Sequence, residues 1–278
     1  MLSVIIPITG ENRKKHVETC ITFLRKQSWK DFEIVLIEQI DAMLGGSRTG
    51  GPLYENVPGI DKYLKIRDPG ENHFNQPWMA NVGARISDGD KFLFYDIDIV
   101  CTDNYLQSVY NFDAPYFIAW NNMYCLTPEN SDKVHTNKDI ENEYISNAEV
   151  YCSGTLDYAG FAVCITKNFF YNKLGEYNEN YLGWGGNDND IAWRALKILG
   201  REFKFKHNLY HMWHPKGYSK YMLWERRDVW LTTYKNPMKV NNRLLAIKKG
   251  NPNKQTYIDI RDIRVDSKKE HIKKRTNK

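Results

Sequence analysis

The sequence lacks the features that mark a membrane-spanning or disulfide-stabilised protein. No stretch approaches the roughly 18 apolar residues that a membrane-spanning helix needs. The first residues, MLSVIIPITG, have no basic segment ahead of an apolar one, as a signal peptide has. The 5 cysteines are scattered without CxxC spacing, which favours reduced thiols. We therefore expect a cytoplasmic protein.

An excess of one charge is also missing. The chain has 39 Lys and Arg against 34 Asp and Glu, so its formal net charge of +5 does not favour a nucleic-acid partner. Basic residues gather in the tail 266–278, DSKKEHIKKRTNK, which is typical of a solvated segment. Contact of this tail with anionic lipid, as a peripheral membrane association, is the alternative. Aromatic residues are plentiful at 14%, which suits a sugar-stacking surface as well as an ordinary core.

Strand and helix patterns alternate along the first 215 residues. Apolar runs predict buried strands at 2–8, 32–39, 62–66, 91–98 and 160–166. Apolar residues at helical spacing predict helices over 11–27, 77–87 and 190–199. The alternating stretch 202–214 predicts a further strand, and the polar, Asn-rich stretch 126–150 is interpreted as an insertion. The alternation predicts an α/β fold with a mostly parallel sheet flanked by helices.

The same patterns suggest how the chain is divided. We expect a single catalytic domain over 1–215 and a basic tail over 266–278. The segment 216–265 between them is rich in Trp, Tyr and Arg, and we expect it to form a helical extension packed on the domain.

An acidic pair follows one predicted strand. In open α/β sheets, ligands bind at the carboxyl ends of the strands, and Asp96 and Asp98 lie at the end of the apolar run KFLFY. On an extended chain both carboxylates leave from the same face, and paired carboxylates can hold a divalent cation. Turn-forming aspartates at a solvated strand end are the alternative.

Two histidines are the next candidate ligands. On a continuing strand His211 and His214 face opposite sides, so one binds metal while the other packs. A bend ahead of Pro215 would instead bring both inward. An Asp–Asp–His set suits Mn²⁺, because Mn²⁺ accepts imidazole whereas Mg²⁺ prefers oxygen ligands.

The stretch GWGGNDND, at 183–190, combines a glycine turn, an aromatic plate and two carboxylates. The glycines permit the backbone to approach a ligand and to hinge, and Trp184 offers a face on which a sugar can stack. Asp188 suits a general base, and capping of the following helix is the alternative. Four Asp and Asn residues crowd this turn, and a cap needs only one, so the surplus favours function.

Six segments, in order, resemble the β-1,4-galactosyltransferases and, more loosely, other GT-A glycosyltransferases. They are IIPITGENRKKHV, VLIEQ, FNQPWMANVGARISDGDKFLFYDIDIV, YAGFAV, GWGGNDND and LYHMWH, and they extend over roughly residues 2–214. The resemblance implies a GT-A fold, a UDP-sugar donor, a saccharide acceptor and Mn²⁺, with Mg²⁺ as the alternative cofactor.

The resemblance also implies roles for individual residues. Asp188 would be the catalytic base, and Asp98 with His211 would bind the metal, with Asp96 near the metal or ribose and His214 as a further ligand. Donor-binding positions would be Pro7, Ile8, Thr9, Arg13, Glu38, Phe74, Gln76, Asn81, Asp96 and Ile97. Acceptor-binding positions would be Tyr158, Gly160, Trp184, Gly185, Gly186 and Asp190.

The chain departs from the family pattern at several positions. Gln76 stands where the family usually has an arginine, and Asn187 and Asn189 stand where it carries acids. Phe161 replaces a glycine near the donor sugar. The family's membrane anchor, stem and disulfide cysteines are absent, which implies a cytosolic enzyme. These departures bear on the identity of both sugars.

The residues and the resemblance together predict a metal-dependent, inverting transfer of a hexose or N-acetylhexosamine, with galactose favoured, from a UDP-sugar to a saccharide hydroxyl. A retaining GT-A transferase and a non-catalytic protein that binds sugars or nucleotide-sugars are the alternatives. A nucleotidyltransferase is less consistent with the sequence, because the loop PITGENR is poor in the Gly and Lys that cradle a pyrophosphate.

Overall fold

The structure, a computed structural model, describes residues 1–40, 53–66, 74–140, 144–145, 148–155, 158–179, 181 and 186–215. The glycine-rich loop at 45–51, residues Gly183 to Gly185, the predicted extension 216–265 and the tail 266–278 lie outside the described residues. In the part of the chain that is described, no helix is both long and apolar enough to cross a bilayer.

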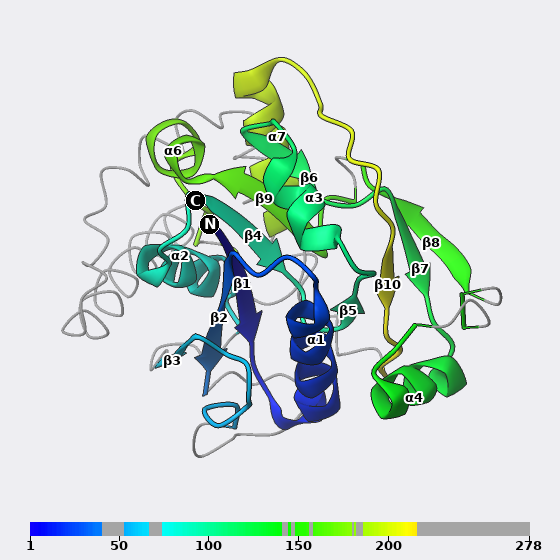
Figure 1. Ribbon diagram of the computed structural model, residues 1–278. Coiled ribbons are helices and arrows are strands. Elements are labelled where there is room, and N and C mark those ends of the chain that lie inside the picture. The colour runs from blue at the N-terminus through cyan, green and yellow to red at the C-terminus, as the bar shows by residue number, and fades with distance from the viewer. Residues whose placement is uncertain are drawn as a thin grey trace, which may run out of the picture.

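A six-stranded sheet forms the centre of the molecule, with the strand order β3-β2-β1-β4-β9-β6 (Figure 1). Strands β3, β2, β1 and β4 run parallel, and β9 is antiparallel to both β4 and β6. The strands are β1 (Leu2–Ile8), β2 (Phe32–Gln39), β3 (Lys62–Ile66), β4 (Lys91–Tyr95), β6 (Tyr116–Ile118) and β9 (Ala162–Thr166). The mostly parallel α/β sheet is confirmed, and its first three strands have the predicted bounds.

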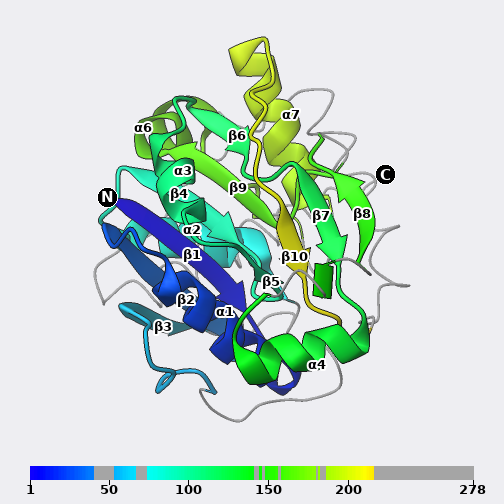
Figure 2. The ribbon, with the colours of Figure 1, turned by 45° about the vertical axis from the view of Figure 1, so that its right-hand side comes forward.

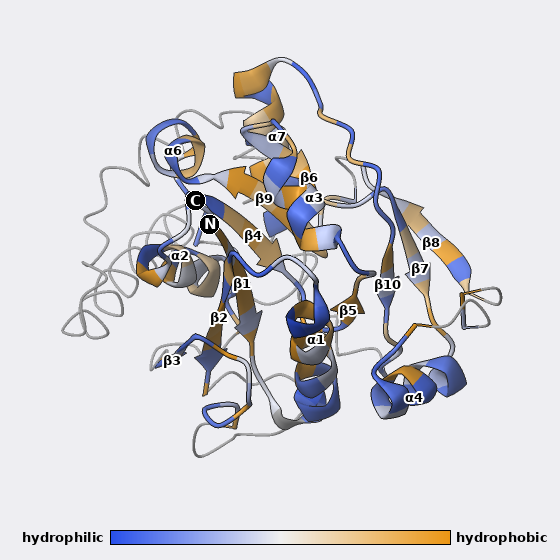
Figure 3. Ribbon diagram, viewed as in Figure 1, coloured by the Kyte–Doolittle hydropathy of each residue, from blue (hydrophilic) through white to orange (hydrophobic). Residues whose placement is uncertain are grey.

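Helices cover both faces of this sheet, which is why β1 and β2 are buried along their whole length. Figure 2 shows α1 in front of the sheet and α2 behind it, and Figure 3 shows apolar residues concentrated on the central strands. The described helices are η1 (Glu11–Arg13, 3₁₀), α1 (Lys14–Lys26), α2 (Gln76–Ile86), α3 (Tyr105–Asn111), α4 (Pro128–Asn137), α6 (Lys167–Phe169), the π-helical η2 (Phe170–Leu174) and α7 (Asn187–Leu199). The three predicted helices are therefore confirmed to within a few residues.

Helix α7 begins at a glycine. Gly186, at φ 85°, is its N-cap residue, and no side chain caps the helix. The positive φ is strained for residues with a Cβ atom, so this turn favours glycine. Asp188 is the second residue of the helix, so the alternative in which it serves as the cap is wrong. Its carboxylate stays available for another role.

A second, smaller sheet lies beside the first, with the order β5-β10-β7-β8 (Figures 1 and 2). Its strands are β5 (Ile99–Val100), β7 (Asn122–Cys125), β8 (Glu149–Ser153) and β10 (Leu209–His211). The strand predicted over 202–214 is therefore much too long, because only Leu209–His211 forms a strand, which pairs with β7 along its length and with β5 through Tyr210 and His211. The stretch 126–150 contributes α4 and the start of β8 to this layer.

Strand β4 also ends earlier than predicted. It stops at Tyr95, and residues 96–98 form a turn that leads into β5. The argument that Asp96 and Asp98 leave one face of an extended strand is therefore wrong. Because the chain turns between them, the two carboxylates have different partners.

Candidate active site

Three side chains converge beside the turn that follows β4. The ligand atoms of Asp98, His211 and His214 all lie within 4.8 Å of one another, the only such group among the described residues. His214 Nε2 lies 3.1 Å from one carboxylate oxygen of Asp98, and His211 Nε2 lies 3.8 Å from the other. One carboxylate and two imidazoles form a donor set that fits a divalent transition metal better than Mg²⁺.

The pairing of β10 with β5 brings these residues together. His211 lies opposite Ile99, the residue that follows Asp98, and Met212 N donates a 2.8 Å hydrogen bond to the Asp98 carbonyl. Because β10 ends at His211, the chain is free to turn, and His214 returns to the same carboxylate. Of the two arrangements considered for the histidines, the structure has the bent one, in which both face Asp98.

Residues from three other elements surround the two histidines. Trp213 N donates to Ser131 Oγ at 2.7 Å, and the Trp213 carbonyl lies 3.2 Å from His16 Nε2. Behind His211, Cys125 Sγ lies 4.0 Å from Nδ1. The contacts of Trp213 hold the backbone beside His214, and Cys125 lies next to the His211 ring. The sequence carried no signal for them, because they come from α1, α4 and β7, which are far apart along the chain.

Arg13 adds a cation to the same place. Its Nη1 lies 3.5 Å from an oxygen of Asp98, and its Nη2 lies 3.2 Å from His214 Nδ1. Burial alone would raise the pKa of Asp98, but the hydrogen bond from His214 and the charges of His211 and Arg13 hold it below its usual range. Burial lowers the pKa of His211, which favours the neutral imidazole that metals bind.

Asp96 does not belong to this group. Its Oδ1 accepts a 3.0 Å hydrogen bond from Gln76 Nε2, and its backbone N–H donates to the Phe161 carbonyl at 2.8 Å. Burial raises the pKa of Asp96, and the neighbouring charges of Asp98 and Asp188 raise it further.

A cleft opens beside Asp96. It is lined by Pro7, Gln76, Ala80, Phe94, Tyr95, Asp96, Gly160, Phe161, Ala162, Val163, Tyr177, Asn187 and Asp188. Burial raises the pKa of Asp188 to about 6, so this carboxylate can take up a proton near neutral pH. A Cβ atom on Gly160 would lie 3.2 Å from Asp188 Oδ2, so glycine leaves room beside the carboxylate.

Two amide side chains connect Asp188 to Asp96. Asn187 Nδ2 lies 3.2 Å from Asp188 Oδ1 and donates to Gln76 Oε1 at 3.1 Å, and Gln76 in turn donates to Asp96. Gln76 and Asn187 are both positions at which the sequence departs from the family pattern. The structure shows that the two departures contact each other, as a neutral amide pair.

The other donor-site predictions lie at the carboxyl ends of β1 and β2. Thr9 Oγ1 donates to the Gln39 carbonyl at 2.7 Å. Glu38 is buried, and its carboxylate accepts hydrogen bonds from Leu53 N, Tyr54 N and Tyr63 Oη. Ile8 and Ile97 are buried in the core, and Phe74 packs against it half-buried. Among these remaining donor-site predictions, only Pro7, near the end of β1, lines the cleft.

Asn81 and Asp190 do not line the cleft, contrary to expectation. Asn81 is buried and holds the backbone of Tyr177 through a pair of hydrogen bonds. Asp190 is buried with its carboxylate 2.8 Å from Arg194, one helical turn further along α7. Burial raises the pKa of Asp190, against the opposing charge of Arg194. Both side chains are engaged in packing.

The residues predicted for the acceptor site lie in different places. Gly160 lines the cleft, Gly186 starts α7, and Tyr158 is 53% exposed at the surface. Trp184 and Gly185 lie outside the described residues. Phe161 has φ 68°, so this non-glycine residue adopts the backbone conformation that favours the glycine it replaces.

No protein-family model matches the sequence, and no curated protein matches it. Solved structures do match. Residues 1–349 of the TarS protein of S. aureus, in complex with UDP-GlcNAc, are 14% identical with a TM-score of 0.50, and the match covers 77% of this chain and 59% of that fragment. The catalytic domain of Drosophila β1,4-galactosyltransferase 7, in complex with xylobiose, is 14% identical with a TM-score of 0.41, covering 74% and 64%. A mannosyltransferase from Pyrobaculum calidifontis, with GDP-Man and Mn²⁺, is 15% identical with a TM-score of 0.46, covering 86% and 64%.

These structures share the GT-A glycosyltransferase fold. The chain spans less than two thirds of the length of each of them, and at 14% identity the TarS match identifies an architecture and not an activity. The element order, the mixed sheet and this match agree with one another. The protein therefore has an α/β fold of the GT-A type.

Proposed function

We propose that this protein is a metal-dependent glycosyltransferase that moves a sugar from a UDP-sugar to a saccharide hydroxyl with inversion of the anomeric centre. The observation that carries the proposal is that Asp98 belongs to a metal-type donor set, while Asp96, two residues before it, lines a cleft together with Asp188. Asp98 follows the carboxyl end of β4, where open α/β sheets bind ligands, which supports the proposal.

The donor set fits the metal in its chemistry. Asp98, His211 and His214 would hold Mn²⁺, and two imidazoles make Mg²⁺ the weaker candidate. A bound divalent ion would stabilise the negative charge that develops on the diphosphate leaving group.

Arg13 is the residue we assign to the diphosphate of the donor. Its Nη1 is buried and has no hydrogen-bond acceptor among the described residues. A guanidinium is suited to phosphate oxygens because its N–H groups form a planar fork. Pro7, near the end of β1 and six residues before Arg13, lines the cleft.

Asp188 is the residue we assign to the acceptor. Its carboxylate would take the proton from the acceptor hydroxyl while that oxygen forms the new bond to the anomeric carbon and the bond to the UDP oxygen breaks. A pKa of about 6 leaves the group mostly ionised near neutral pH, and such a base still accepts a proton readily. A retaining enzyme would not need this base, which is why we prefer inversion.

The donor sugar remains the least specified part of the proposal. The resemblance to β-1,4-galactosyltransferases favours galactose. Phe161 places a ring at the cleft where that family has a glycine, and a ring narrows the space for the sugar. We therefore propose a hexose or N-acetylhexosamine, with UDP-galactose as the first donor to test.

Release of the nucleotide tests the proposal directly. The protein would be incubated with UDP-galactose, UDP-glucose, UDP-GalNAc, UDP-GlcNAc or GDP-mannose, together with Mn²⁺ and mixed saccharide acceptors. We expect release of UDP from one UDP-sugar, loss of release in EDTA, and a product of opposite anomeric configuration by NMR. Sugar binding without nucleotide release would favour the non-catalytic alternative, and retained configuration would favour a retaining transferase.

We also propose a cytoplasmic location, in keeping with cysteines that are all free. The membrane contact considered for the basic tail is not part of this proposal.

A further inference from the structure

We propose that Tyr151, Tyr158 and Phe161 form an aromatic ledge, a second saccharide subsite beside the cleft. The ledge would bind a sugar unit of the acceptor next to the one that carries the attacking hydroxyl. This inference rests on the proposed function and makes it more specific: the acceptor is an oligosaccharide or glycan chain rather than a single sugar.

Phe161 joins the ledge to the cleft. Its ring lies edge-on to Trp120 at 5.6 Å and to His211 at 5.7 Å, and the residue lines the cleft that contains Asp188. The backbone at Phe161 is held at φ 68°, and its carbonyl accepts the hydrogen bond from Asp96 N. A strained conformation of this kind persists only where the surroundings hold it, and such positions cluster at ligand sites.

Tyr151 is aimed at Phe161 by a second irregularity of the backbone. In the register of β7 and β8, Val150 pairs with Tyr124 and Cys152 pairs with Met123, so Tyr151 has no partner opposite it. An unpaired extra residue is a β-bulge, and bulges re-aim side chains beside active sites. The ring centroids of Tyr151 and Phe161 are 6.4 Å apart at an interplanar angle of 86°.

Both tyrosines are open to solvent. Tyr151 is 62% exposed and Tyr158 is 53% exposed, whereas most aromatic rings of the described chain are buried or half-buried. Tyr158 precedes Phe161 by three residues, and its N–H donates to the Thr155 carbonyl at 2.9 Å, two residues past the end of β8. Strand β8 is an outer strand of the second sheet, as Figure 2 shows, which leaves this side accessible.

The chemistry of the ledge favours a sugar over an apolar protein segment. Sugar rings present C–H faces that pack on aromatic rings and hydroxyls that need polar partners. The neighbours of Tyr151 on β8 include the exposed residues Glu149 and Ser153, and Ser153 Oγ donates to Asn122 Oδ1 at 2.9 Å. The ledge also continues through Phe161 into a cleft lined by carboxylates. An apolar partner would leave these groups without hydrogen bonds.

Substitution of Tyr151 tests the ledge, with Val150→Ala as the matched control. Val150 is 53% exposed on the same strand but offers no ring. Binding of each purified protein would be measured on an array of mono- to hexasaccharides. For the best acceptor found and its one-unit-shorter homologue, KM and kcat would then be compared.

We expect Tyr151→Ala to raise the KM for the longer saccharide about 3- to 10-fold, in the range of one aromatic contact. The kcat, the KM for the shorter homologue and the KM for the UDP-sugar should stay the same. Tyr151→Phe should bind as the wild type does, because it keeps the ring, and Val150→Ala should also be unaffected. Melting temperatures would show that each variant is folded.

Three results would overturn the ledge: equal loss for the short and long saccharides, no loss with Tyr151→Ala, or a wild-type protein that binds no saccharide of the array. The array does not depend on turnover, so it tests the ledge even without catalysis. Absence of nucleotide release from every donor would overturn the proposed function instead. Intact release with a KM that does not depend on acceptor length would overturn the ledge alone.

Discussion

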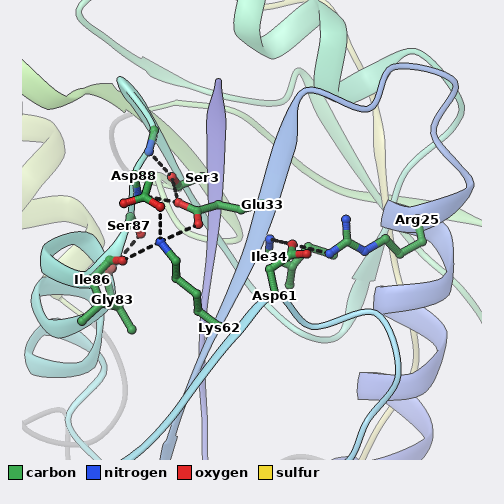
Figure 4. Close-up of polar contacts among 11 residues, drawn as sticks. Ser3, Arg25, Glu33, Ile34, Asp61, Lys62, Gly83, Ile86, Ser87 and Asp88 are labelled. Carbon is green, nitrogen blue, oxygen red and sulfur yellow. Dashed lines mark hydrogen bonds and ion pairs between the residues drawn. The ribbon is translucent and has the colours of Figure 1, made fainter. Parts of the chain in front are cut away.

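The two ends of the central sheet both carry buried acids, but the acids at the amino end have more cationic partners than those at the carboxyl end. At the amino ends of the strands, Glu33 accepts hydrogen bonds from Ser3 Oγ and Asp88 N, each at 2.6 Å, and pairs with Lys62 at 2.8 Å (Figure 4). Lys62 also pairs with Asp88 at 2.7 Å. A few residues away, Arg25 pairs with Asp61, which accepts a hydrogen bond from Ile34 N.

At the carboxyl ends, the acids outnumber the cations that face them. Asp96 has Asp98 and Asp188 as acidic neighbours, and Arg13 forms an ion pair with Asp98. Burial raises the pKa of Asp96, together with its acidic neighbours, and also raises the pKa of Asp188. The charges of this end are less well compensated than those of the other.

This difference separates stability from function. A buried carboxylate with full partners holds the fold together, and loss of one partner leaves the other uncompensated. A buried carboxylate without enough partners destabilises the fold, and such groups cluster where a ligand supplies the missing charge. The amino end should therefore respond to mutation in stability, and the carboxyl end in binding and rate.

The largest effect is expected for Asp98→Ala. The carboxylate contacts both histidines and Arg13, so its loss should weaken Mn²⁺ binding more than 100-fold, beyond the 10- to 100-fold typical of an outer-shell residue. Sugar transfer should fall below detection. Titration of the free protein with Mn²⁺, followed by electron paramagnetic resonance, measures the binding without any need for activity.

Glu33→Ala is the matched control at the opposite end. Its loss removes the hydrogen-bond acceptor of Ser3 and one of the two carboxylate partners of Lys62, so the free energy of unfolding should fall by about 1–3 kcal/mol while the affinity for Mn²⁺ stays the same. Denaturant unfolding gives the first quantity. Normal Mn²⁺ binding by Asp98→Ala would remove the metal site, and weakened binding by a folded Glu33→Ala would remove the distinction between the two ends.

Asp188→Asn should have the next largest effect. Removal of a positioned base typically lowers kcat by about 10²–10⁴, while the affinities for UDP and Mn²⁺ should stay near wild type. Steady-state kinetics alongside binding titrations would separate the two. A variant with normal kcat would leave the base unassigned and favour the retaining mechanism.

The raised pKa of Asp188 gives the same prediction a pH dependence. Because the ionised form is the base, kcat/KM should rise with pH through about 6 and then level off, and Asp188→Asn should lose this step. Stability should move the other way. The folded state holds the proton more tightly than the unfolded chain, so the contribution of this group to stability falls as pH rises from about 4 to about 6.

The sequence predicted the long, apolar strands of this fold better than the short ones. Strands β1, β2 and β3 are continuous apolar or β-branched runs, and their bounds were predicted to the residue. Strand β10 has three residues, and its neighbour β5 has two. Their positions follow from pairing between distant segments, which leaves no periodic signal in the sequence.

In the candidate site, too, some residues could be picked out from a local pattern, whereas others are placed by contacts between distant segments. Asp98 and His211 were chosen as candidate ligands by their place in an order of segments that resembles a family, and the structure brings the two side chains together. The return of His214 to the same carboxylate depends on where β10 ends, which a local pattern does not reveal. The contact between Gln76 and Asn187 joins residues 111 positions apart. Each looked like an isolated departure, and only the folded chain shows them to be partners.

The histidines provide the third prediction. Since both imidazoles reach Asp98, His211→Ala and His214→Ala should each weaken Mn²⁺ binding by a similar factor, about 10- to 100-fold. His135→Ala, on α4, is a suitable control, because His135 contacts His16 and Thr19 rather than Asp98. A loss confined to His211→Ala would mean that His214 only packs beside the site.

The smallest effect is expected for Arg13→Gln. Its guanidinium lies 3.5 Å from Asp98 and competes with a metal ion for the same carboxylate. Without nucleotide, the variant should therefore bind Mn²⁺ about 3- to 10-fold more tightly, which is about 0.7–1.4 kcal/mol. Its affinity for UDP should fall, because the diphosphate loses a guanidinium partner.

Arg25→Gln removes the corresponding cation at the amino end, where Asp61 has no role in binding, so it should change neither affinity. Calorimetric titrations of the two variants with Mn²⁺ and with UDP measure all four values. If Arg13→Gln instead weakens Mn²⁺ binding, then Arg13 does not compete with the metal for Asp98. It would instead orient the metal ligands.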